Sequence, residues 1–140
     1  MNPKPTIYIG IDPGTHTGIA IWDCKSSTLT EISTMKAHAA MDAVLLIFWE
    51  KPSICVLFED ARLRTWFGNT GKERLMGAGS IRRDCTIWEE FLTDYGIPFE
   101  TVPPKNVRTK LSAEQFERYT GWTQKTSEHG RDAAMLIFGK

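Results

Sequence analysis

The run ICVLF at residues 54–58 is the feature that most restricts what this chain can fold into. Its side chains are apolar at every position, so both faces of a strand formed there have to be buried. Strands of this kind lie in the centre of a parallel or mixed sheet that helices cover on both faces. The run therefore predicts an α/β fold in which residues 54–58 form a central strand that ends at Glu59.

The rest of the chain predicts the order of the other elements. Four further segments rich in β-branched and aromatic residues predict strands at 6–11, 17–22, 29–35 and 97–102. Four segments with apolar residues at helical spacing predict helices at 39–50, 77–95, 112–119 and 126–138. For the second helix, the predicted apolar face consists of Ile81, Cys85, Trp88 and Leu92. We expect one domain over residues 1–140, with a mixed five-stranded sheet, its first and central strands parallel, and helices on both faces.

Composition narrows the class of protein. The formal net charge is zero, from 17 basic and 17 acidic residues, so binding of nucleic acid has to depend on local clusters of positive charge. The three cysteines are widely spaced, which predicts a reducing compartment and neither a disulfide framework nor a CxxC zinc site. No apolar run approaches the ~20 residues of a membrane span, and the first residues lack the pattern of a signal peptide. We therefore expect a cytoplasmic protein with no membrane partner.

Three carboxylates occupy positions where they can meet. Asp12 follows the first strand, Glu59 ends the central strand, and Asp132 lies in the first turns of the last helix. The carboxyl ends of parallel strands lie at one edge of a sheet, and a helix across that edge can bring the third acid to the other two. Such oxygen ligands suit Mg²⁺ or Mn²⁺, and two ions roughly 3.5–4 Å apart can activate water for phosphodiester cleavage. Taken alone, Asp12 is also typical of a turn, and Asp132 of a helix start.

Three stretches together, IGIDPGTHTGIAIWD, VLFEDAR and EHGRDAAMLI, resemble the RuvC-type Holliday-junction resolvases. That family has a first-strand Asp followed by Pro-Gly, a glutamate ending the fourth strand, and a late helix with His or Asp three residues before Asp-Ala. The resemblance implies an RNase H-like fold and a Mg²⁺-dependent endonuclease, with Mn²⁺ as a substitute, that acts on branched DNA as a homodimer. It implies catalytic and metal-binding roles for Asp12, Glu59, His129 and Asp132. The small size is compatible with a bacteriophage protein, which would act in the host cytoplasm.

Two residues beside these acids have further candidate roles. His129 and Asp132 are three positions apart and share one face of a helix, so His129 could ligate a metal or handle a proton. Outside the motif, His129 would be read as a solvent-exposed residue at a helix start. Asp60 is expected to point to the opposite side of the strand from Glu59, and we treat it as a secondary candidate.

Two basic segments are candidates for contact with DNA. Basic residues bind phosphate and aromatic residues can stack on unpaired bases. Both segments follow strand ends, so they can flank the acids. The alternative is that these side chains only make the surface soluble. The candidates are Arg62, Arg64, Trp66, Phe67, Lys72 and Arg74 in the first segment, and Lys105, Arg108 and Lys110 in the second.

Three other functions stay open at this point. The same fold could belong to an RNA or RNA–DNA-hybrid nuclease similar to the RuvC-like YqgF group. ATP-binding proteins of the sugar-kinase and actin group also place Asp and Gly-Thr after a first strand, but they generally need two domains, for which 140 residues is too short. A non-catalytic DNA-binding module would gain nothing from a cluster of acids facing phosphates.

Overall fold

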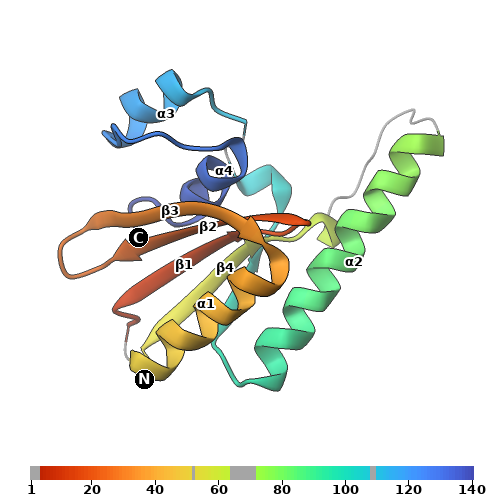
Figure 1. Cartoon of the computed structure of the whole chain (residues 1–140), viewed down its shortest axis with the longest axis horizontal. Helices are drawn as coiled ribbons and strands as arrows, with labels where there is room; N and C mark the ends of the chain where they lie inside the picture. Colours follow the sequence, from red (N-terminus) through yellow and green to blue (C-terminus); the bar gives the residue numbers. More distant parts are fainter. Residues whose placement is uncertain (1–3, 52, 64–71, 108–109) are drawn as a thin grey trace.

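A computed structural model provides the structure of the chain and describes residues 4–51, 53–63, 72–107 and 110–140, with the backbone alone for 72–78 and 105. Its centre is a five-stranded sheet in the order β3-β2-β1-β4-β5 (Figure 1). The strands are β1 (Ile7–Asp12), β2 (His16–Asp23), β3 (Thr28–Lys36), β4 (Ile54–Glu59) and β5 (Phe99–Val102). The pairs β1–β2 and β2–β3 are antiparallel, and the pairs β1–β4 and β4–β5 are parallel. The predicted mixed sheet, with parallel first and central strands, is confirmed.

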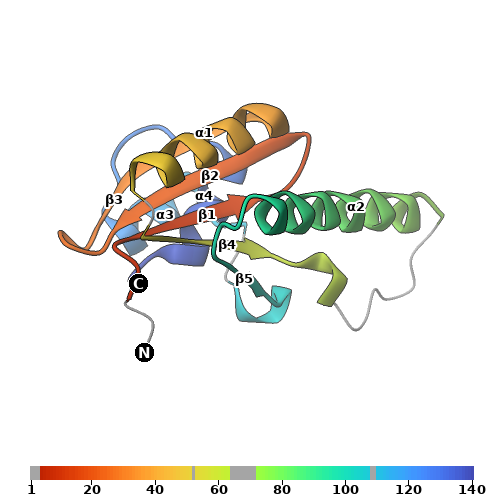
Figure 2. The same cartoon turned by 90° about the horizontal axis from the view of Figure 1, so that it is seen from below.

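Helices cover both faces of the sheet, as predicted. The helices α1 (Ala37–Glu50) and α2 (Lys72–Asp94) lie on one face (Figure 2). The helix α4 (Glu128–Ile137), with α3 (Ala113–Thr120) beside it, packs on the other. Among the described residues, none of the helices combines the length and the apolar character that spanning a membrane requires.

The central strand β4 is buried on both sides, which is what its sequence predicts. Ile54, Val56 and Phe58 belong to the core beneath α1 and α2. Cys55 and Leu57 belong to the second core, beneath α3 and α4. Since side chains alternate along a strand, the next residue after Phe58 faces the α4 side.

The helix α2 differs from the prediction at its start. It begins at Lys72 rather than at residue 77, and Ile81 of its predicted apolar face is 48 % exposed. Cys85, Trp88 and Leu92 are buried as expected. Figure 1 shows the reason: the first turns of α2 project past the end of the sheet. The prediction for Ile81 was therefore wrong, because helical spacing does not reveal where the surface beneath a helix ends.

Two 3-10 turns follow strands of the sheet, and a capping box begins α3. The turns are η1 (Ala61–Leu63), directly after the central strand, and η2 (Pro104–Asn106), directly after β5. The Ser112 hydroxyl caps α3 by accepting a hydrogen bond from the backbone N–H of Gln115 at 3.1 Å. The Gln115 side chain returns one from Ser112 N–H, which completes a capping box. Both 3-10 turns lie at the carboxyl end of a parallel strand, so they border the edge where ligand sites form.

Candidate active site

Asp12 and Glu59 are the last residues of two neighbouring parallel strands. The register of β1 and β4 pairs Ile11 with Phe58, which makes Asp12 and Glu59 the next pair along the two strands. Ile11 and Phe58 are buried beneath α1 and α2, so the following residues face the opposite side of the sheet. Two carboxylates thus leave the same edge of the sheet on the face that α4 covers.

The helix α4 packs against this face with its backbone almost touching the strands. A β-carbon on Gly10 would lie 2.1 Å from the carbonyl oxygen of Ala133, and one on Gly18 would lie 1.9 Å from that of His129. Both distances are far inside van der Waals contact, so only glycine permits this approach at the two positions. Gly18 is part of the sequence motif, whereas a role for Gly10 was not predicted. The signal was available, since a glycine within a strand often marks a close approach of another backbone.

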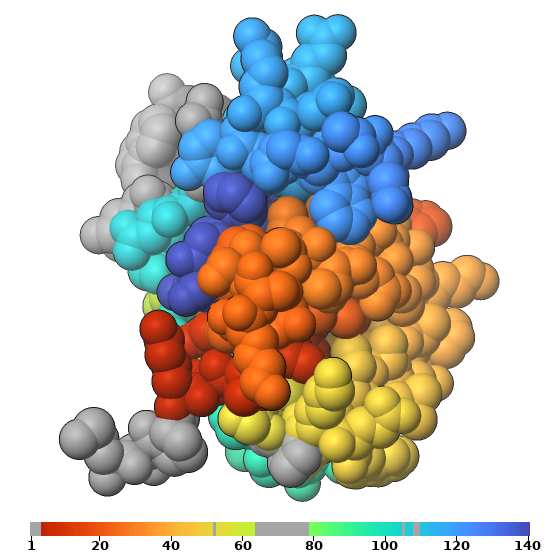
Figure 3. Space-filling model, turned by 90° about the vertical axis from the view of Figure 1, so that its left-hand side faces the viewer, coloured from red at the N-terminus to blue at the C-terminus, as the bar shows by residue number. Residues whose placement is uncertain are grey.

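The start of α4 is held against β3. The Ser127 hydroxyl caps the helix by accepting a hydrogen bond from Gly130 N–H at 3.0 Å. The same hydroxyl is hydrogen-bonded to the hydroxyl of Thr34 on β3. Figure 3 shows the segment before α4, in blue, lying directly against β3, in orange. These contacts fix where the first turn of α4 begins over the sheet.

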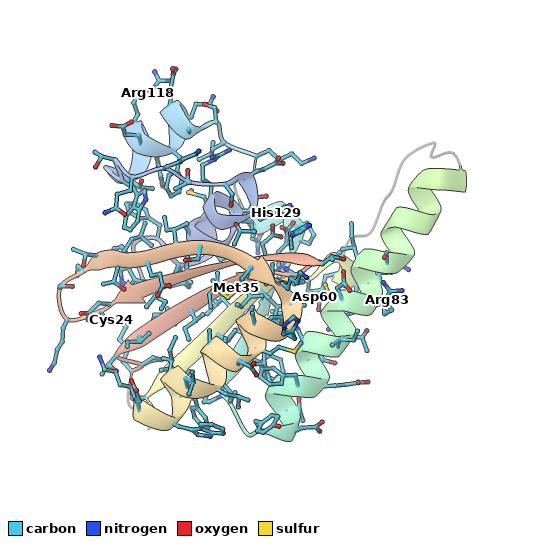
Figure 4. All side chains as sticks on the ribbon, viewed as in Figure 1. Cys24, Met35, Asp60, Arg83, Arg118 and His129 are labelled. Atoms are coloured by element: carbon cyan, nitrogen blue, oxygen red, sulfur yellow. The ribbon has the colours of Figure 1, made fainter. Side chains whose placement is uncertain are left out.

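This placement brings His129 to Asp12. Nδ1 of His129 lies 3.0 Å from Oδ2 of Asp12, although the two residues are 117 positions apart in the sequence. The His129 side chain is 50 % exposed and the Asp12 carboxylate 18 %. In Figure 4, His129 lies at the end of the sheet where Asp60 follows the central strand, while Cys24 lies at the opposite end.

Asp132 lies one turn further along α4 and accepts a backbone hydrogen bond. Its Oδ1 accepts from the N–H of Lys110 at 2.9 Å. Lys110 has φ +60°, a left-handed conformation that costs free energy for any residue with a β-carbon. Arg131 stabilises the same segment, because its Nε donates to the carbonyl of Leu111 at 2.8 Å and its Nη1 to that of Thr126 at 3.1 Å. The backbone before α3 is thus hydrogen-bonded to α4 beside Asp132.

The electrostatic environment disfavours negative charge on these acids. Burial, together with the negative charges of Asp132 and Glu128, raises the pKa of Asp12 to about 6, against the opposing hydrogen bond from His129. Burial is also the main cause of a raised pKa at Asp132, with Glu128 adding to it and the Lys110 N–H opposing it. Carboxylates placed so that ionisation is unfavourable are typical of a site that a cation completes.

The donor chemistry of the site fits a hard divalent cation. Carboxylate oxygens and an imidazole nitrogen are ligands that Mg²⁺ and Mn²⁺ accept. Within the described ranges, however, no three His, Cys, Asp or Glu side chains already converge as a metal-holding group. One Asp12 oxygen is engaged by His129 and one Asp132 oxygen by Lys110.

Asp60 points away from this cluster, as predicted. Its side chain is 3 % exposed and forms an ion pair at 2.8 Å with Arg62 on the α2 side of the sheet. Arg62 also bonds to Glu89 of α2 at 2.9 Å. The basic segment predicted Arg62 as a DNA contact, whereas in the structure its guanidinium faces two carboxylates.

The other predicted DNA contacts fall mostly outside the described residues. Lys110 is described and exposed at the edge of the site, beside Asp132. Arg64, Trp66, Phe67 and Arg108 lie outside the described residues, as do the side chains of Lys72, Arg74 and Lys105. For this group, contact with DNA stays a prediction.

Comparison with known proteins identifies a solved structure of similar fold. No family model matches the chain, and no curated protein matches it significantly. Among solved structures, RuvC from T. thermophilus in complex with a Holliday junction substrate matches with a TM-score of 0.60 and 17% sequence identity, over 94% of this chain and 90% of that one. At this identity the similarity establishes the fold alone, and a bacteriophage source stays a prediction. The chain therefore has a RuvC-like, RNase H-like α/β fold, as its sequence motifs predicted.

Proposed function

We propose that this chain is a metal-dependent endonuclease that cleaves Holliday junctions or other branched DNA. The observation that carries the proposal is the contact of His129 with Asp12 at the carboxyl edge of the parallel strands, with Glu59 at the end of the neighbouring strand and Asp132 one turn further along α4. Ligand and active sites in sheets of this type lie at that edge. A fold similar to RuvC bound to a Holliday junction substrate supports the same substrate class.

Asp12, Glu59, His129 and Asp132 are the residues that would hold Mg²⁺ or Mn²⁺. When bound, a pair of such ions supplies an activated water and stabilises the leaving oxygen of the phosphodiester. The raised pKa of Asp12 supports this assignment, because a buried acid with an acidic neighbour is stabilised in its ionised form by a cation. His129 would ligate the ion through a ring nitrogen, and its half-exposed side chain leaves room for that.

The chain's own groups have separate tasks in this proposal. Asp12 and Glu59 extend from a rigid sheet, so their backbone positions are fixed before substrate arrives. His129 is bonded to Asp12 through Nδ1, and its half-exposed ring would face the bound substrate or ion. Lys110 extends from a backbone already bonded to Asp132, and its ammonium group would contact a phosphate beside the scissile one.

The proposed partner is a branched DNA engaged by two copies of the chain. A homodimer related by two-fold symmetry matches the symmetry of a four-way junction. The overall charge balance of zero makes this binding depend on local basic residues, so we expect it to weaken steeply with salt. The described cysteines, Cys24, Cys55 and Cys85, are all free thiols. We infer that the chain acts in a reducing compartment such as the cytoplasm.

The experiment that tests the proposal is cleavage of a labelled four-way DNA junction beside a matched duplex and an RNA–DNA hybrid, with Mg²⁺ or Mn²⁺. The variants are Asp12→Asn and, as a matched control, Asp42→Asn, an exposed acid on α1 on the opposite face of the sheet. We expect paired nicks in the junction with the wild type and with Asp42→Asn, and none with Asp12→Asn.

Other outcomes would assign other functions. Cleavage of the hybrid alone would keep the metal site and move the function to RNA, as in the YqgF-like alternative. Binding to the junction without metal-dependent cleavage of any substrate would contradict the endonuclease and favour a non-catalytic DNA-binding module.

A further inference from the structure

We propose that Arg62 is a positioning residue for Glu59 and does not contact DNA. It joins the end of the central strand to α2 through Asp60 and Glu89. The inference rests on the proposed function, because Glu59 is one of the metal-binding acids there.

The link between Arg62 and Asp60 is bidentate and includes the backbone. Nε and Nη2 of Arg62 each lie 2.8 Å from an oxygen of Asp60, and the backbone N–H of Arg62 donates to the same carboxylate at 3.0 Å. Asp60 is 2% exposed, and the hydrogen bonds from Arg62 hold its pKa below the ordinary value. A planar guanidinium paired in this way with a buried carboxylate has a fixed orientation.

The outer side of the guanidinium is bonded to α2. Nη2 donates to Glu89 Oε2 at 2.9 Å, and Nη1 donates to Glu89 Oε1 at 3.3 Å and to the hydroxyl of Thr86 at 3.4 Å. One turn earlier on α2, the thiol of Cys85 donates to the backbone carbonyl of Glu59 at 3.6 Å. The same stretch of α2 therefore contacts both Glu59 itself and the residue that follows it.

These contacts constrain Glu59 from the side opposite its own side chain. Asp60 N–H donates to the carbonyl of Val102 at 2.9 Å, which extends the pairing with β5 by one residue. Because side chains alternate along the strand, a fixed Asp60 side chain on the α2 face keeps Glu59 turned toward the α4 face. Rotation of the strand end about its axis would move both together.

Arg62 is poorly suited to bind a phosphate in this setting. With Asp60 and Glu89, it forms a group of one positive and two negative charges, a net charge of −1. Its Nε and both terminal nitrogens already donate to protein oxygens. A phosphate would have to displace Glu89 and approach a negative group, which costs free energy.

The variant Glu89→Gln separates the two roles of Arg62 because they predict opposite effects. If Arg62 contacted DNA, removing the negative charge of Glu89 would favour phosphate at its guanidinium and tighten junction binding. If Arg62 positions Glu59, the same change loosens the strand end, which lowers kcat about 10- to 100-fold and leaves the junction Kd unchanged. Glu89 is 42 % exposed, so this variant is expected to fold, whereas Arg62→Gln leaves the buried Asp60 without its partner.

The experiment measures junction Kd, single-turnover cleavage and Mn²⁺ binding to the DNA-free protein by electron paramagnetic resonance, for the wild type and four variants. The variants are Glu89→Gln, Arg62→Lys, Glu59→Gln and Arg118→Gln, the last being a control on α3, away from the acids (Figure 4). We expect Glu89→Gln to weaken Mn²⁺ binding in the same direction as Glu59→Gln, and Arg62→Lys to retain part of the wild-type activity. Arg118→Gln should match the wild type.

Four results would contradict the positioning role of Arg62 or the proposed function. Tighter junction binding by Glu89→Gln, or kcat and Mn²⁺ affinity equal to those of the wild type, would overturn the positioning role while leaving the nuclease intact. A wild type that cleaves no substrate would instead overturn the proposed function. Unchanged Mn²⁺ affinity in Glu59→Gln would remove Glu59 from the metal site, and the positioning role with it.

Discussion

Nδ1 of His129 lies 3.0 Å from Oδ2 of Asp12, and this contact joins the start of α4 to the end of β1. It sits on a carboxylate that burial and nearby Asp132 make unfavourable to ionise, so that the pKa of Asp12 is raised to about 6. When no cation is present, ionised Asp12 therefore lowers the stability of the folded protein. Residues needed for activity often lower stability in this way, so a change at Asp12 should affect the free energy of unfolding and cleavage in opposite directions.

Replacing Asp12 by Asn should stabilise the metal-free protein while abolishing cleavage. The folded pKa of Asp12 lies above its unfolded value of 3.8, so ionisation costs the folded state free energy, and this cost grows as pH rises from about 4 to about 6 and is constant above that. A shift of this size corresponds to roughly 3 kcal/mol at neutral pH. The Asn carbonyl can still accept a hydrogen bond from His129.

Urea denaturation in EDTA from pH 4 to 7.5 measures this effect. The free energy of unfolding of Asp12→Asn should exceed that of the wild type by an amount that increases up to about pH 6 and then levels off. The control Asp42→Asn removes an exposed acid and should show no such trend. A stability difference that does not vary with pH would contradict the raised pKa.

Added Mg²⁺ should stabilise the wild type and reverse the order of the two proteins. A ligand that binds only the folded state adds stability that grows with the logarithm of the ratio of its concentration to Kd. At 100 times Kd the gain is about 2.7 kcal/mol. Thermal denaturation with increasing Mg²⁺ should raise the Tm of the wild type, with little effect on Asp12→Asn, and excess EDTA should remove the gain. Equal shifts in both proteins would place the ion elsewhere.

Adding a methyl group at Gly18 should displace α4 and disable the site. The new β-carbon would lie 1.9 Å from the carbonyl of His129, a backbone atom that cannot move alone. Overpacking of this kind destabilises a protein by about 3 kcal/mol or more. Circular dichroism during urea denaturation, with a cleavage assay, would measure both losses.

The matched control for Gly18→Ala is Gly79→Ala. Gly79 lies in α2, and a β-carbon there meets nothing within 4 Å. Replacing a helical glycine by alanine should stabilise the protein by roughly 0.5–1 kcal/mol without changing cleavage. Wild-type stability and activity in Gly18→Ala would show that α4 does not depend on this close approach.

Replacing Lys110 by Gly should weaken junction binding without unfolding the protein. Glycine accepts the left-handed backbone at φ +60° and retains the N–H that bonds to Asp132, so only the ammonium side chain is lost. Removing one phosphate contact should reduce the slope of log Kd against log salt by about 0.9. Relief of strain and the greater unfolded-state entropy of glycine oppose each other, so stability should change by less than about 1 kcal/mol.

The control for Lys110→Gly is Ser27→Gly. Ser27 has φ +54° in the connection between β2 and β3, so the change relieves a similar backbone conformation away from the acids. Its junction binding and salt dependence should equal those of the wild type. An unaltered salt slope in Lys110→Gly would show that Lys110 makes no phosphate contact.

Much of the fold could be predicted from the sequence, since local patterns encode it. The run at residues 54–58, which is apolar on both faces of a strand, predicted a buried central strand, and all five residues are buried. The alternation along that strand predicted opposite directions for Glu59 and Asp60, and the ion pair of Asp60 on the α2 side agrees with this. The motif placed Asp12 and His129 in one site, and their hydrogen bond agrees with that placement.

Other features were not predictable because they depend on how separate elements pack. Ile81 fits the apolar spacing of α2, yet it is exposed because the start of the helix extends beyond the end of the sheet. Arg62 fits a basic segment, yet Asp60 and Glu89 surround its guanidinium. Nothing in the spacing of residues 62 and 89 indicates that they meet.

The sequence by itself determined the order of the elements, the face to which each strand residue points and which acids reach the carboxyl edge. Side-chain directions repeat every 2 residues in a strand and every 3.6 residues in a helix. The pattern of apolar and polar residues therefore shows these properties directly. Only the tertiary structure decided how closely α4 approaches Gly10 and Gly18, and which carboxylates Arg62 pairs with. Those contacts join residues far apart in the chain, and their distances depend on the rotation and depth at which each helix packs on the sheet.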